Sequence, residues 1–527
     1  MCGFMFSSDT KINRELFESQ FKKIEYRGPD MSRIEYGDEV TMAFHRLAIM
    51  GLTPDGMQPF NRGAYSVICN GELYGFRKVK RELEELGYTF KSGSDCEILI
   101  PLYKEYGLDM FKHLDAEFAC VLYDHKRKHI IAARDPFGIR PMFYGYSKTS
   151  GKIMFASEAK CLVELCSQVF PFPVGHYYFD GTFTSYHDVS QSSKHVNADL
   201  DTICEGIRLR LTDGVKKRMD ADAPVGYLLS GGLDSSLVCS LASKMGDKPI
   251  RTFAVGMSED AIDLKYAKEV AEFIKSEHTE VIISKEDVLG CLDEVIRTLE
   301  TWDITTIRAS IGMYLLCKWI KKNTDIKVIF TGEISDELFG YKYTDFAPNA
   351  IEFQKEAQKR VSELYMYDVL RADRCISSNG LEGRVPFGDL EFVDFVMSIS
   401  PAKKMNTYNM GKYLLRKAFE GDVLPENILY RDKAAFSDAV GHSLVDYLKE
   451  YAEEYYSDEE FKKLCTKYSH HAPYTKESLL YREIFDKYYH GFDTLIKDYW
   501  LPNQSWEGCA ISDPSARYLS NYGKSGE

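Results

Sequence analysis

Residues 225–236 read Val-Gly-Tyr-Leu-Leu-Ser-Gly-Gly-Leu-Asp-Ser-Ser. The apolar beginning is typical of a buried strand, and an amphipathic helical pattern follows it. Between them, Ser230–Ser236 place two glycines, several hydroxyls and free N–H groups at a helix amino terminus, which favours binding of a pyrophosphate group. Asp234 adds a carboxylate of the kind that Mg²⁺ prefers. A glycine turn alone would mean little, but the full heptapeptide between strand and helix predicts a phosphate site.

The surrounding sequence alternates strands and helices. Strand patterns lie at Val225–Leu229, Thr252–Val255, Glu280–Ile283 and Lys327–Phe330, with helical patterns between them. This spacing predicts a parallel sheet covered by helices on both faces, with ligands at the carboxyl ends of its strands. No GxxxxGK[ST] motif is present, so the phosphate site is not of the Walker type. From about residue 349 to 500 the pattern is almost wholly helical, and residues 502–527 form a polar tail that could be disordered.

A second acidic cluster follows the strand at Lys327–Phe330. It reads Thr-Gly-Glu-Ile-Ser-Asp-Glu over residues 331–337. On a parallel sheet this cluster lies at the same edge as Ser230–Ser236. We therefore expect Glu333 to act on the substrate and Asp336 to bind metal together with Asp234. A simple helix cap around Ser335 is the structural alternative, and both roles can coexist.

Residues 1 to about 190 follow a different pattern. Short β-branched runs next to one another in sequence predict an α+β fold with largely antiparallel strands. A polar stretch at 190–199 is the candidate linker. If Met1 is removed, Cys2 carries a thiol beside its own α-amine, the arrangement of amino-terminal nucleophile enzymes.

Several polar residues of this half suit an α-amino acid whose side chain ends in an amide. Arg46 can bind the substrate carboxylate, while Glu72 and Asp95 can bind the α-ammonium group. The Asn70 side chain and the Gly71 N–H can donate to the oxyanion that forms when Cys2 attacks the amide. Taken singly, each residue is more often a turn or cap residue.

Composition limits the possible classes of function. The chain has 527 residues, which predicts more than one domain, and a net charge of -14, which argues against nucleic acid as the main ligand. We find no apolar run long enough for a membrane span and no signal-peptide pattern. Thirteen cysteines without paired spacing indicate reduced thiols. These features predict a cytoplasmic protein that does not associate with a membrane.

The motifs together resemble two known modules. Residues 2–190 resemble a class II glutamine amidotransferase, with an amino-terminal nucleophile (Ntn) sandwich fold. Residues 200–501 resemble the ATP pyrophosphatase domain of asparagine synthetases, an α/β parallel-sheet domain with a helical carboxy-terminal part. The resemblance implies that glutamine is contacted in the first module by the segment that begins at Arg46 and by two later turns. These residues are Arg46, Leu47, Ala48, Ile49, Met50, Asn70, Gly71, Glu72 and Asp95.

The resemblance also assigns the second site. It implies ATP contacts from residues of four segments, namely Leu229, Ser230, Gly232, Asp234, Ser235, Val255, Thr331, Gly332 and Lys433. Arg308 and Arg384 are expected near the acceptor substrate or the closed site. The implied reaction hydrolyses glutamine at Cys2, adenylates aspartate at Glu333 with ATP and Mg²⁺, and aminates it to asparagine. The implied assembly is a homodimer.

Two positions depart from the family pattern. Ile334 replaces a usual glycine, and since a β-branched residue adopts positive φ poorly, we expect this loop to follow a different path. Gly75 stands where relatives commonly carry asparagine. The alternative function that remains open is a glutamine-dependent amide synthetase acting on a different carboxylate, because acceptor choice depends on few pocket residues. A fold that has lost its catalytic activity is a further alternative, but the principal site residues are present.

Overall fold

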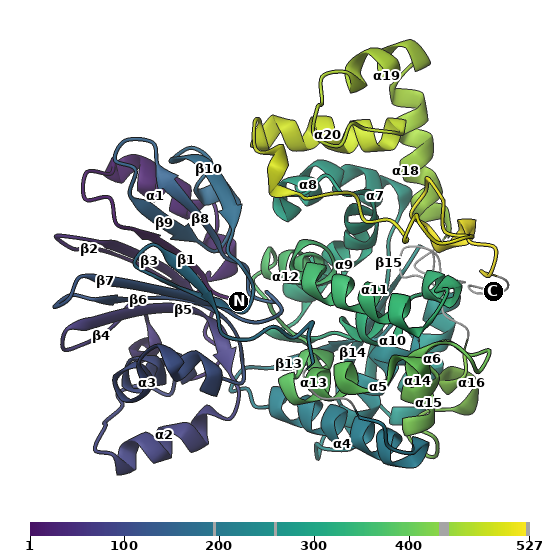
Figure 1. Ribbon diagram of the computed structural model, residues 1–527, viewed down its shortest axis with the longest axis horizontal. Coiled ribbons are helices and arrows are strands. Elements are labelled where there is room, and N and C mark those ends of the chain that lie inside the picture. The colour runs from purple at the N-terminus through teal and green to yellow at the C-terminus, as the bar shows by residue number, and fades with distance from the viewer. Residues whose placement is uncertain (193–195, 258–260, 432–441, 523–527) are drawn as a thin grey trace.

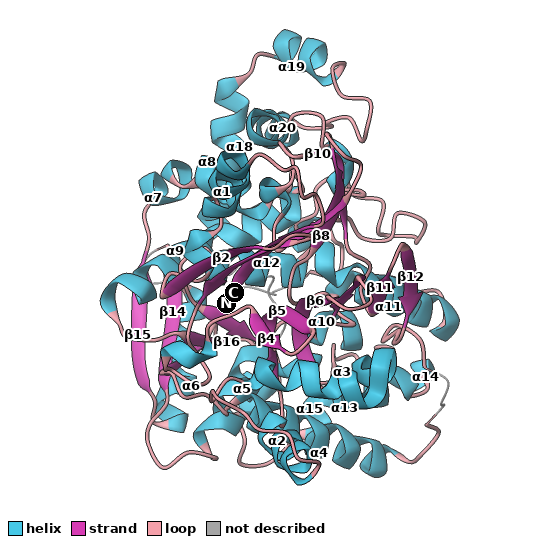
Figure 2. Cartoon of the chain, turned by 90° about the vertical axis from the view of Figure 1, so that its left-hand side faces the viewer, coloured by secondary structure: helices cyan, strands magenta, loops and turns pink. Residues whose placement is uncertain are grey.

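The computed structural model describes residues 1–527 except 193–195, 258–260, 432–441 and 523–527. The chain forms two halves that lie side by side in Figure 1: an antiparallel half from β1 to β12, and a half built on a parallel sheet from α4 onward. Viewed from the side of the antiparallel half, the strands cross the middle of the molecule and most helices lie around them (Figure 2). The α+β and α/β classes predicted for the two halves are confirmed.

The amino-terminal half is a sandwich of two six-stranded sheets. The first sheet has the order β10-β8-β9-β1-β3-β2 and the second β12-β11-β7-β6-β5-β4, and the paired strands in both are antiparallel. The strands are β1 Gly3–Ser7, β2 Met31–Tyr36, β3 Thr41–Arg46, β4 Phe60–Arg62, β5 Tyr65–Leu73, β6 Ala116–Asp124, β7 His129–Arg134, β8 Phe143–Ser147, β9 Ile153–Ala156, β10 Cys166–Pro171, β11 His176–Phe179 and β12 Thr182–Ser185.

An apolar layer joins the two sheets. It includes Phe4 and Phe44 from the first sheet and Ile68, Val121 and Tyr178 from the second, all buried. Helix α1 (Arg14–Lys22) lies on one side of the sandwich, and α2 (Phe76–Glu85) and α3 (Leu99–Tyr106) lie on the other (Figure 1). These four layers are the predicted Ntn sandwich, and they place the amino terminus at the boundary between the halves.

The carboxy-terminal half contains a five-stranded sheet of order β15-β14-β13-β16-β17, in which all neighbours are parallel. Its strands are β13 Val225–Leu228, β14 Arg251–Gly256, β15 Glu277–Ile282, β16 Val328–Phe330 and β17 Glu382–Arg384. The chain leaves β13 in one direction for β14 and β15, and β16 and β17 lie on the opposite side of β13. The strand order therefore reverses between β13 and β16, the place where open parallel sheets form a ligand crevice.

Helices cover both faces of this sheet. Ala254 of β14 and Phe330 of β16 belong to one apolar cluster together with α5 and α6, while Phe253 and Ile329 belong to another together with α8 and α9. The helices of this half are α4 Leu200–Arg218, α5 Leu233–Ser243, α6 Ile262–Ile274, α7 Lys285–Gly290, α8 Leu292–Leu299, α9 Ile304–Asn323, α10 Ser335–Phe339, α11 Ala350–Glu363, α12 Asp368–Ser377, α13 Leu390–Ser398, α14 Pro401–Lys404, α15 Tyr413–Ala418, α16 Glu426–Leu429, α18 His442–Tyr455, α19 Asp458–Cys465 and α20 Lys476–Tyr489.

Two features differ from the expectations. Strand β17 lies inside the stretch predicted to be helical, because three residues that include a central glycine give no strand pattern. Residues 502–527 were expected to form a polar tail that could be disordered, but the described part, residues 502–522, packs on the body of the protein. Trp506, Cys509 and Leu519 are buried in a small apolar cluster, and this burial offsets the entropy lost in ordering the segment.

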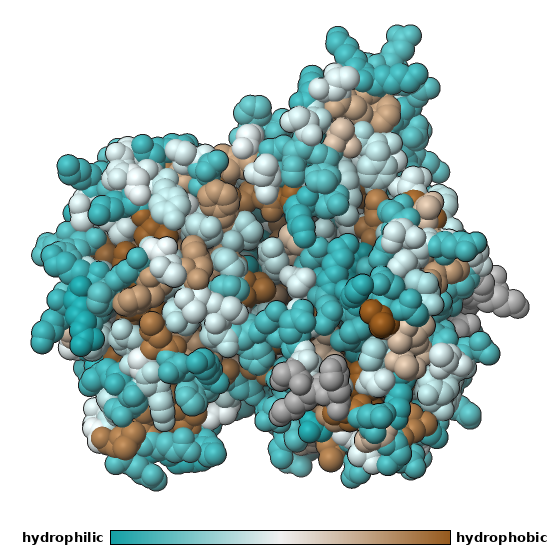
Figure 3. All heavy atoms as spheres, in the orientation of Figure 1, coloured by the Kyte–Doolittle hydropathy of each residue, from teal (hydrophilic) through white to brown (hydrophobic). Residues whose placement is uncertain are grey.

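The surface agrees with the charged composition. On the face shown in Figure 3, hydrophilic residues predominate and hydrophobic ones are scattered. None of the described helices combines the length and apolar character that crossing a membrane requires.

Candidate functional site

One pocket lies at the crevice between β13 and β16. The pocket there is lined by all the residues expected around ATP and metal that the structure describes, namely Leu229, Ser230, Gly232, Asp234, Ser235, Val255, Thr331, Gly332, Glu333 and Asp336. Lys433 lies outside the described residues. The two loops meet here because their strands are parallel neighbours, with Tyr227 opposite Phe330.

Glycines allow the loop after β13 to lie close to both α6 and the loop after β16. Gly231 has φ +71°, and a Cβ there would lie 2.5 Å from the backbone nitrogen of Ala267. A Cβ on Gly332 would lie 2.8 Å from the backbone nitrogen of Ser235. The Ser235 hydroxyl accepts a hydrogen bond from the Ser230 N–H at 3.2 Å. A larger residue at Gly332 would separate the two loops, and a larger residue at Gly231 would push the phosphate loop away from α6.

The two predicted metal ligands come together on a lysine that the sequence did not single out. The Lys412 ammonium lies 2.7 Å from an Asp234 oxygen and 2.6 Å from an Asp336 oxygen. Ser335 donates a hydrogen bond to the other Asp234 oxygen at 2.7 Å. Among the described residues no group of three or more potential ligands forms a ready metal site. Two converging carboxylates nevertheless fit Mg²⁺, which is usually bound by one or two carboxylates together with substrate phosphates.

Glu333 projects into the same pocket from the end of β16. Its carboxylate lies 2.5 Å from Arg371, which also pairs with Asp368 at 2.9 Å. Burial raises the pKa of Glu333 to about 7, and Asp368 and Asp336 add to this effect while Arg371 opposes it. A carboxyl group with a pKa near neutrality can accept and return a proton at physiological pH.

Two further arginines complete the positive side of the pocket. Arg416 lines it, and Arg431 lines it while pairing with Asp263 at 2.9 Å and stacking over the ring of Tyr266. Guanidinium groups suit the oxygens of a polyphosphate. Together with Lys412 they give the pocket the charge that a nucleotide needs.

Ile334 has the positive φ that we expected a β-branched residue to adopt poorly. Its φ is +80°, the left-handed conformation that glycine favours, and its side chain is buried. The surrounding structure holds the residue in this conformation at the expense of local strain. Gly75 also has a positive φ, +69°, with open space where a side chain would begin. Asparagine tolerates this conformation, so the difference from relatives is local.

A second, smaller pocket lies at the boundary between the halves. Most of the residues expected to bind glutamine line it, namely Cys2, Arg46, Leu47, Ile49, Met50, Gly71, Glu72 and Asp95. Glu382 of β17, from the other half, also lines it. Ala48 and Asn70 support the pocket from behind: the Ala48 N–H donates to Asp30 at 2.8 Å, and Asn70 contacts Cys2.

Cys2 is held by its neighbours on both sides. Its N–H donates to the Asn70 Oδ1 at 3.0 Å, and the Leu47 N–H points to its sulfur at 3.4 Å. Within the described residues, the buried Asn70 Nδ2 has no hydrogen-bond partner. A donor that binds an oxyanion must be free in this way before the substrate arrives. With Met1 still attached, the Cys2 nitrogen is an amide, and burial raises the pKa of the thiol to about 11. The amino-terminal nucleophile hypothesis therefore requires removal of Met1.

The polar groups around Cys2 are held in different ways. Arg46 donates to the carbonyls of Thr53 at 2.6 Å and Met50 at 3.3 Å, so that it fixes the loop that follows β3. Burial raises the pKa of Asp95 to about 6. Glu72 pairs with Arg384 at 3.0 Å, and burial raises its pKa well above the usual range although Arg384 opposes this.

Models of known families match nearly the whole chain. A glutamine amidotransferase domain matches residues 1–217, and asparagine synthase matches residues 206–355 and 346–512. The chain belongs to the asparagine synthase family. A probable glutamine-hydrolysing asparagine synthetase of Acanthamoeba polyphaga mimivirus is 40% identical over 98% of this chain and 100% of its own length. The corresponding enzyme of Mus musculus is 38% identical over 99% of both chains, and asparagine synthetase 1 of Saccharomyces cerevisiae is 39% identical over 95% of both.

Two arginines assigned through the asparagine synthase resemblance are not brought to the nucleotide pocket. Arg308 of α9 is buried and pairs with Glu477 at 2.5 Å and Asp513 at 3.0 Å. Arg384 lies between the halves, with its side chain on Glu72 and Glu382 of the smaller pocket. Each guanidinium pairs with a buried carboxylate from a distant part of the chain, Glu477 for Arg308 and Glu72 for Arg384, which the motifs could not indicate.

Conversely, sequence reasoning missed Arg371, Lys412 and Arg416. The sequence before α15 offers only the pair Gly411-Lys412, which does not by itself indicate a site. Arg371 lies in an unremarkable helical stretch of α12.

Proposed function

We propose that the chain is a glutamine-hydrolysing asparagine synthetase that makes asparagine from aspartate, glutamine and Mg²⁺-ATP. The observation that carries the proposal is the pairing of two pockets in one chain. One pocket contains Cys2 and the other contains Glu333 between the loops that follow β13 and β16. Near-full-length similarity to enzymes of this name supports the choice of product.

In the first half-reaction, Cys2 releases ammonia from glutamine. After Met1 is removed, the thiol attacks the side-chain amide carbon and its proton passes to the α-amine of Cys2. The Asn70 amide and the Gly71 N–H stabilise the oxyanion, the leaving ammonia takes the proton, and water then hydrolyses the thioester to glutamate. Glu72 and Asp95 bind the ammonium group of the substrate, and Arg46 binds its carboxylate.

In the second half-reaction, the side-chain carboxylate of aspartate attacks the α-phosphorus of ATP and pyrophosphate leaves. Asp234 and Asp336 would hold Mg²⁺, which neutralises phosphate charge. Lys412, Arg416 and Arg431 orient the phosphates. Ammonia then attacks the acyl adenylate, Glu333 accepts a proton from it, and AMP leaves to give the amide.

The proposal extends to a cytoplasmic homodimer. The homodimer is supported only by family resemblance, and the cytoplasmic location by thirteen cysteines without paired spacing. Sedimentation of the purified chain tests the dimer.

The decisive experiment incubates the protein with glutamine, ATP, Mg²⁺ and a panel of carboxylic acids. When aspartate is the acid, AMP, pyrophosphate and asparagine should be formed in equal amounts. If aspartate fails while another acid is converted to its amide, the protein is an amide synthetase with a different acceptor.

A further inference from the structure

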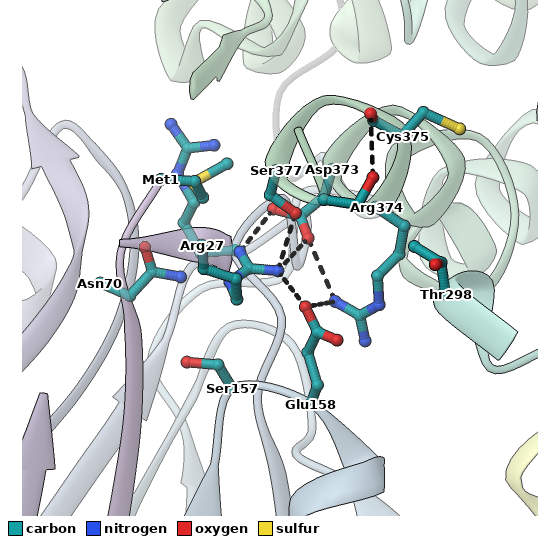
Figure 4. Close-up of polar contacts among 12 residues, drawn as sticks. Met1, Arg27, Asn70, Ser157, Glu158, Thr298, Asp373, Arg374, Cys375 and Ser377 are labelled. Atoms are coloured by element: carbon teal, nitrogen blue, oxygen red, sulfur yellow. Dashed lines mark hydrogen bonds and ion pairs between the residues drawn. The ribbon is translucent and has the colours of Figure 1, made fainter. Parts of the chain in front are cut away.

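A buried ion cluster joins the two halves behind the glutamine pocket. Figure 4 shows Arg27, from the turn before β2, pointing toward Asp373 and Ser377 of α12, with Glu158 beside it. The Arg27 guanidinium lies 2.9 and 3.0 Å from the two Asp373 oxygens and 2.6 Å from Glu158. The side chains of Arg27 and Glu158 are fully buried, and that of Asp373 is 1% exposed.

The remaining donor of Arg27 reaches the nucleophile residue. Its Nε donates to the carbonyl oxygen of Cys2 at 2.9 Å. Since Asn70 binds the nitrogen of the same residue, the polar backbone groups on both sides of the Cys2 Cα are fixed. These two contacts fix the backbone of Cys2 and thereby the direction of the Cα–Cβ bond that carries the thiol.

Asp373 decides where the guanidinium lies. Its two oxygens meet two nitrogens of Arg27, the paired geometry that fixes an arginine in orientation as well as position. Burial alone would lower the pKa of Arg27, but Asp373 first and then Glu158 outweigh burial and raise it. Asp373 is itself held by Arg374 at 3.1 Å, which also pairs with Glu300 at 2.7 Å.

We propose that Asp373, a residue of the carboxy-terminal half, is a positioning residue for Cys2 in the amino-terminal half. The contact runs from Asp373 through Arg27 to the Cys2 carbonyl, so glutamine hydrolysis depends on the docking of α12. The same helix carries Arg371, which binds Glu333. Helix α12 thus fixes the geometry of both pockets. This inference rests on the proposed function for the chemistry at Cys2 but not on the identity of the acceptor.

The test compares Asp373→Asn with wild type, using preparations in which mass spectrometry confirms removal of Met1. Asparagine at this position keeps the shape but removes the charge that holds Arg27. Glutamine hydrolysis should fall about ten- to hundredfold in kcat, the scale expected for a displaced reacting group. The rate of Cys2 alkylation by iodoacetamide should change, and its pH profile should shift. Asparagine synthesis from added ammonia should stay within about twofold of wild type, showing that the other pocket is intact.

Asp220→Asn is the matched control. Asp220 pairs with Arg77 across the same two halves at 3.0 Å, but both side chains are about half exposed. This variant should hydrolyse glutamine at the wild-type rate, because the substitution changes only a side chain whose ion pair is exposed to solvent. Equal loss in both Asp→Asn variants would mean general loosening of the halves and would overturn the positioning role.

Ser377→Ala is a milder substitution that tests the same position of Arg27 if Asp373→Asn fails to fold. It removes the neutral hydroxyl that accepts a hydrogen bond from Arg27 at 3.0 Å, and it should lower hydrolysis about two- to fivefold. Wild-type hydrolysis in both Asp373→Asn and Ser377→Ala overturns the proposal, as does unchanged alkylation in Asp373→Asn. Neither assay needs aspartate or ATP, so a wrong acceptor leaves the result intact. If wild type hydrolyses no glutamine, the proposed function fails while alkylation still tests the positioning.

Discussion

The Lys412 ammonium occupies the position between Asp234 and Asp336 where a cation bound to the nucleotide would lie. It bridges the two aspartates, whose side chains are 21% and 27% exposed. The lysine keeps two carboxylates together that would otherwise repel each other, and it competes with a free cation for the same oxygens. A metal ion that arrives with ATP adds phosphate ligands and can displace it.

Lys412→Met should therefore bind Mn²⁺ in the absence of nucleotide at least about tenfold more tightly than wild type, because the competing charge is gone. Titration calorimetry without ATP measures this. Lys342→Met is the control, since Lys342 lines only the neighbouring pocket. Equal Mn²⁺ affinity in wild type and Lys412→Met would show that the lysine does not compete with a cation.

Glu333 tests the chemistry of the same pocket. Glu333→Gln keeps the shape but loses the proton acceptor and the charge that Arg371 holds. Aspartate-dependent pyrophosphate release should fall by at least about a hundredfold, while hydrolysis of glutamine at Cys2 stays measurable. Synthesis near the wild-type rate would remove Glu333 from the mechanism.

At Ile334, backbone strain lowers the stability of the protein, whereas burial of the side chain raises it. Glycine would relieve about 1–3 kcal/mol of backbone strain but remove a buried side chain worth about 2–5 kcal/mol. Ile334→Gly should therefore be less stable than wild type by about 1–2 kcal/mol, and Ile334→Ala, which keeps the strain, less stable still. Thermal melting of the three proteins decides the order. An alanine variant that melts above the glycine variant would mean that strain at this position is small.

At the scale of elements, ion pairs of Asp513 hold the carboxy-terminal segment, residues 502–522, against the helices of its own half. Asp513 pairs with the buried Arg308 of α9 and with Lys449 of α18 at 2.6 Å. Burial alone would raise the pKa of Asp513, but hydrogen bonding and attraction from Arg308 and then Lys449 outweigh it and lower the pKa to about 2. The folded-state pKa lies below the unfolded value near 4, so the stabilisation is present above pH 4 and is lost as pH falls toward 2.

Asp513→Asn should lower the melting temperature at pH 7, because Arg308 keeps its charge with one partner fewer. The difference from wild type should shrink as the pH is lowered from 4 to 2. Melting curves across this range give the result, and a difference that stays constant with pH would show that the Asp513 charge is not what fastens the segment.

For the whole molecule, the separation of the pockets predicts separable activities. Ammonia formed at Cys2 must reach an acyl adenylate in the other half. Water would protonate ammonia, and an ammonium ion is costly to bury, so an apolar passage is expected between them. Cys2→Ala should lose synthesis from glutamine but keep synthesis from ammonium salts at alkaline pH, where free ammonia is more abundant.

The measurement compares asparagine formed from glutamine and from ammonium by one folded preparation of Cys2→Ala. Persistent use of glutamine would exclude Cys2 as the nucleophile. Loss of both activities in a folded variant would contradict separable sites.

The sequence alone determined the strand, phosphate loop and helix around Ser230–Ser236, the acidic loop after β16 and the place of Cys2. Each is a short contiguous motif. The backbone of Ser230–Ser236 follows from its own glycines and periodicity, whereas the surrounding structure holds Ile334 of the acidic loop in the left-handed conformation. Only the tertiary structure brought Lys412 to Asp234, 178 residues apart, and Arg27 to Asp373, 346 residues apart. Such pairs leave no periodic trace along the chain, because burial of a charge requires only a partner in space and any distant element can supply it.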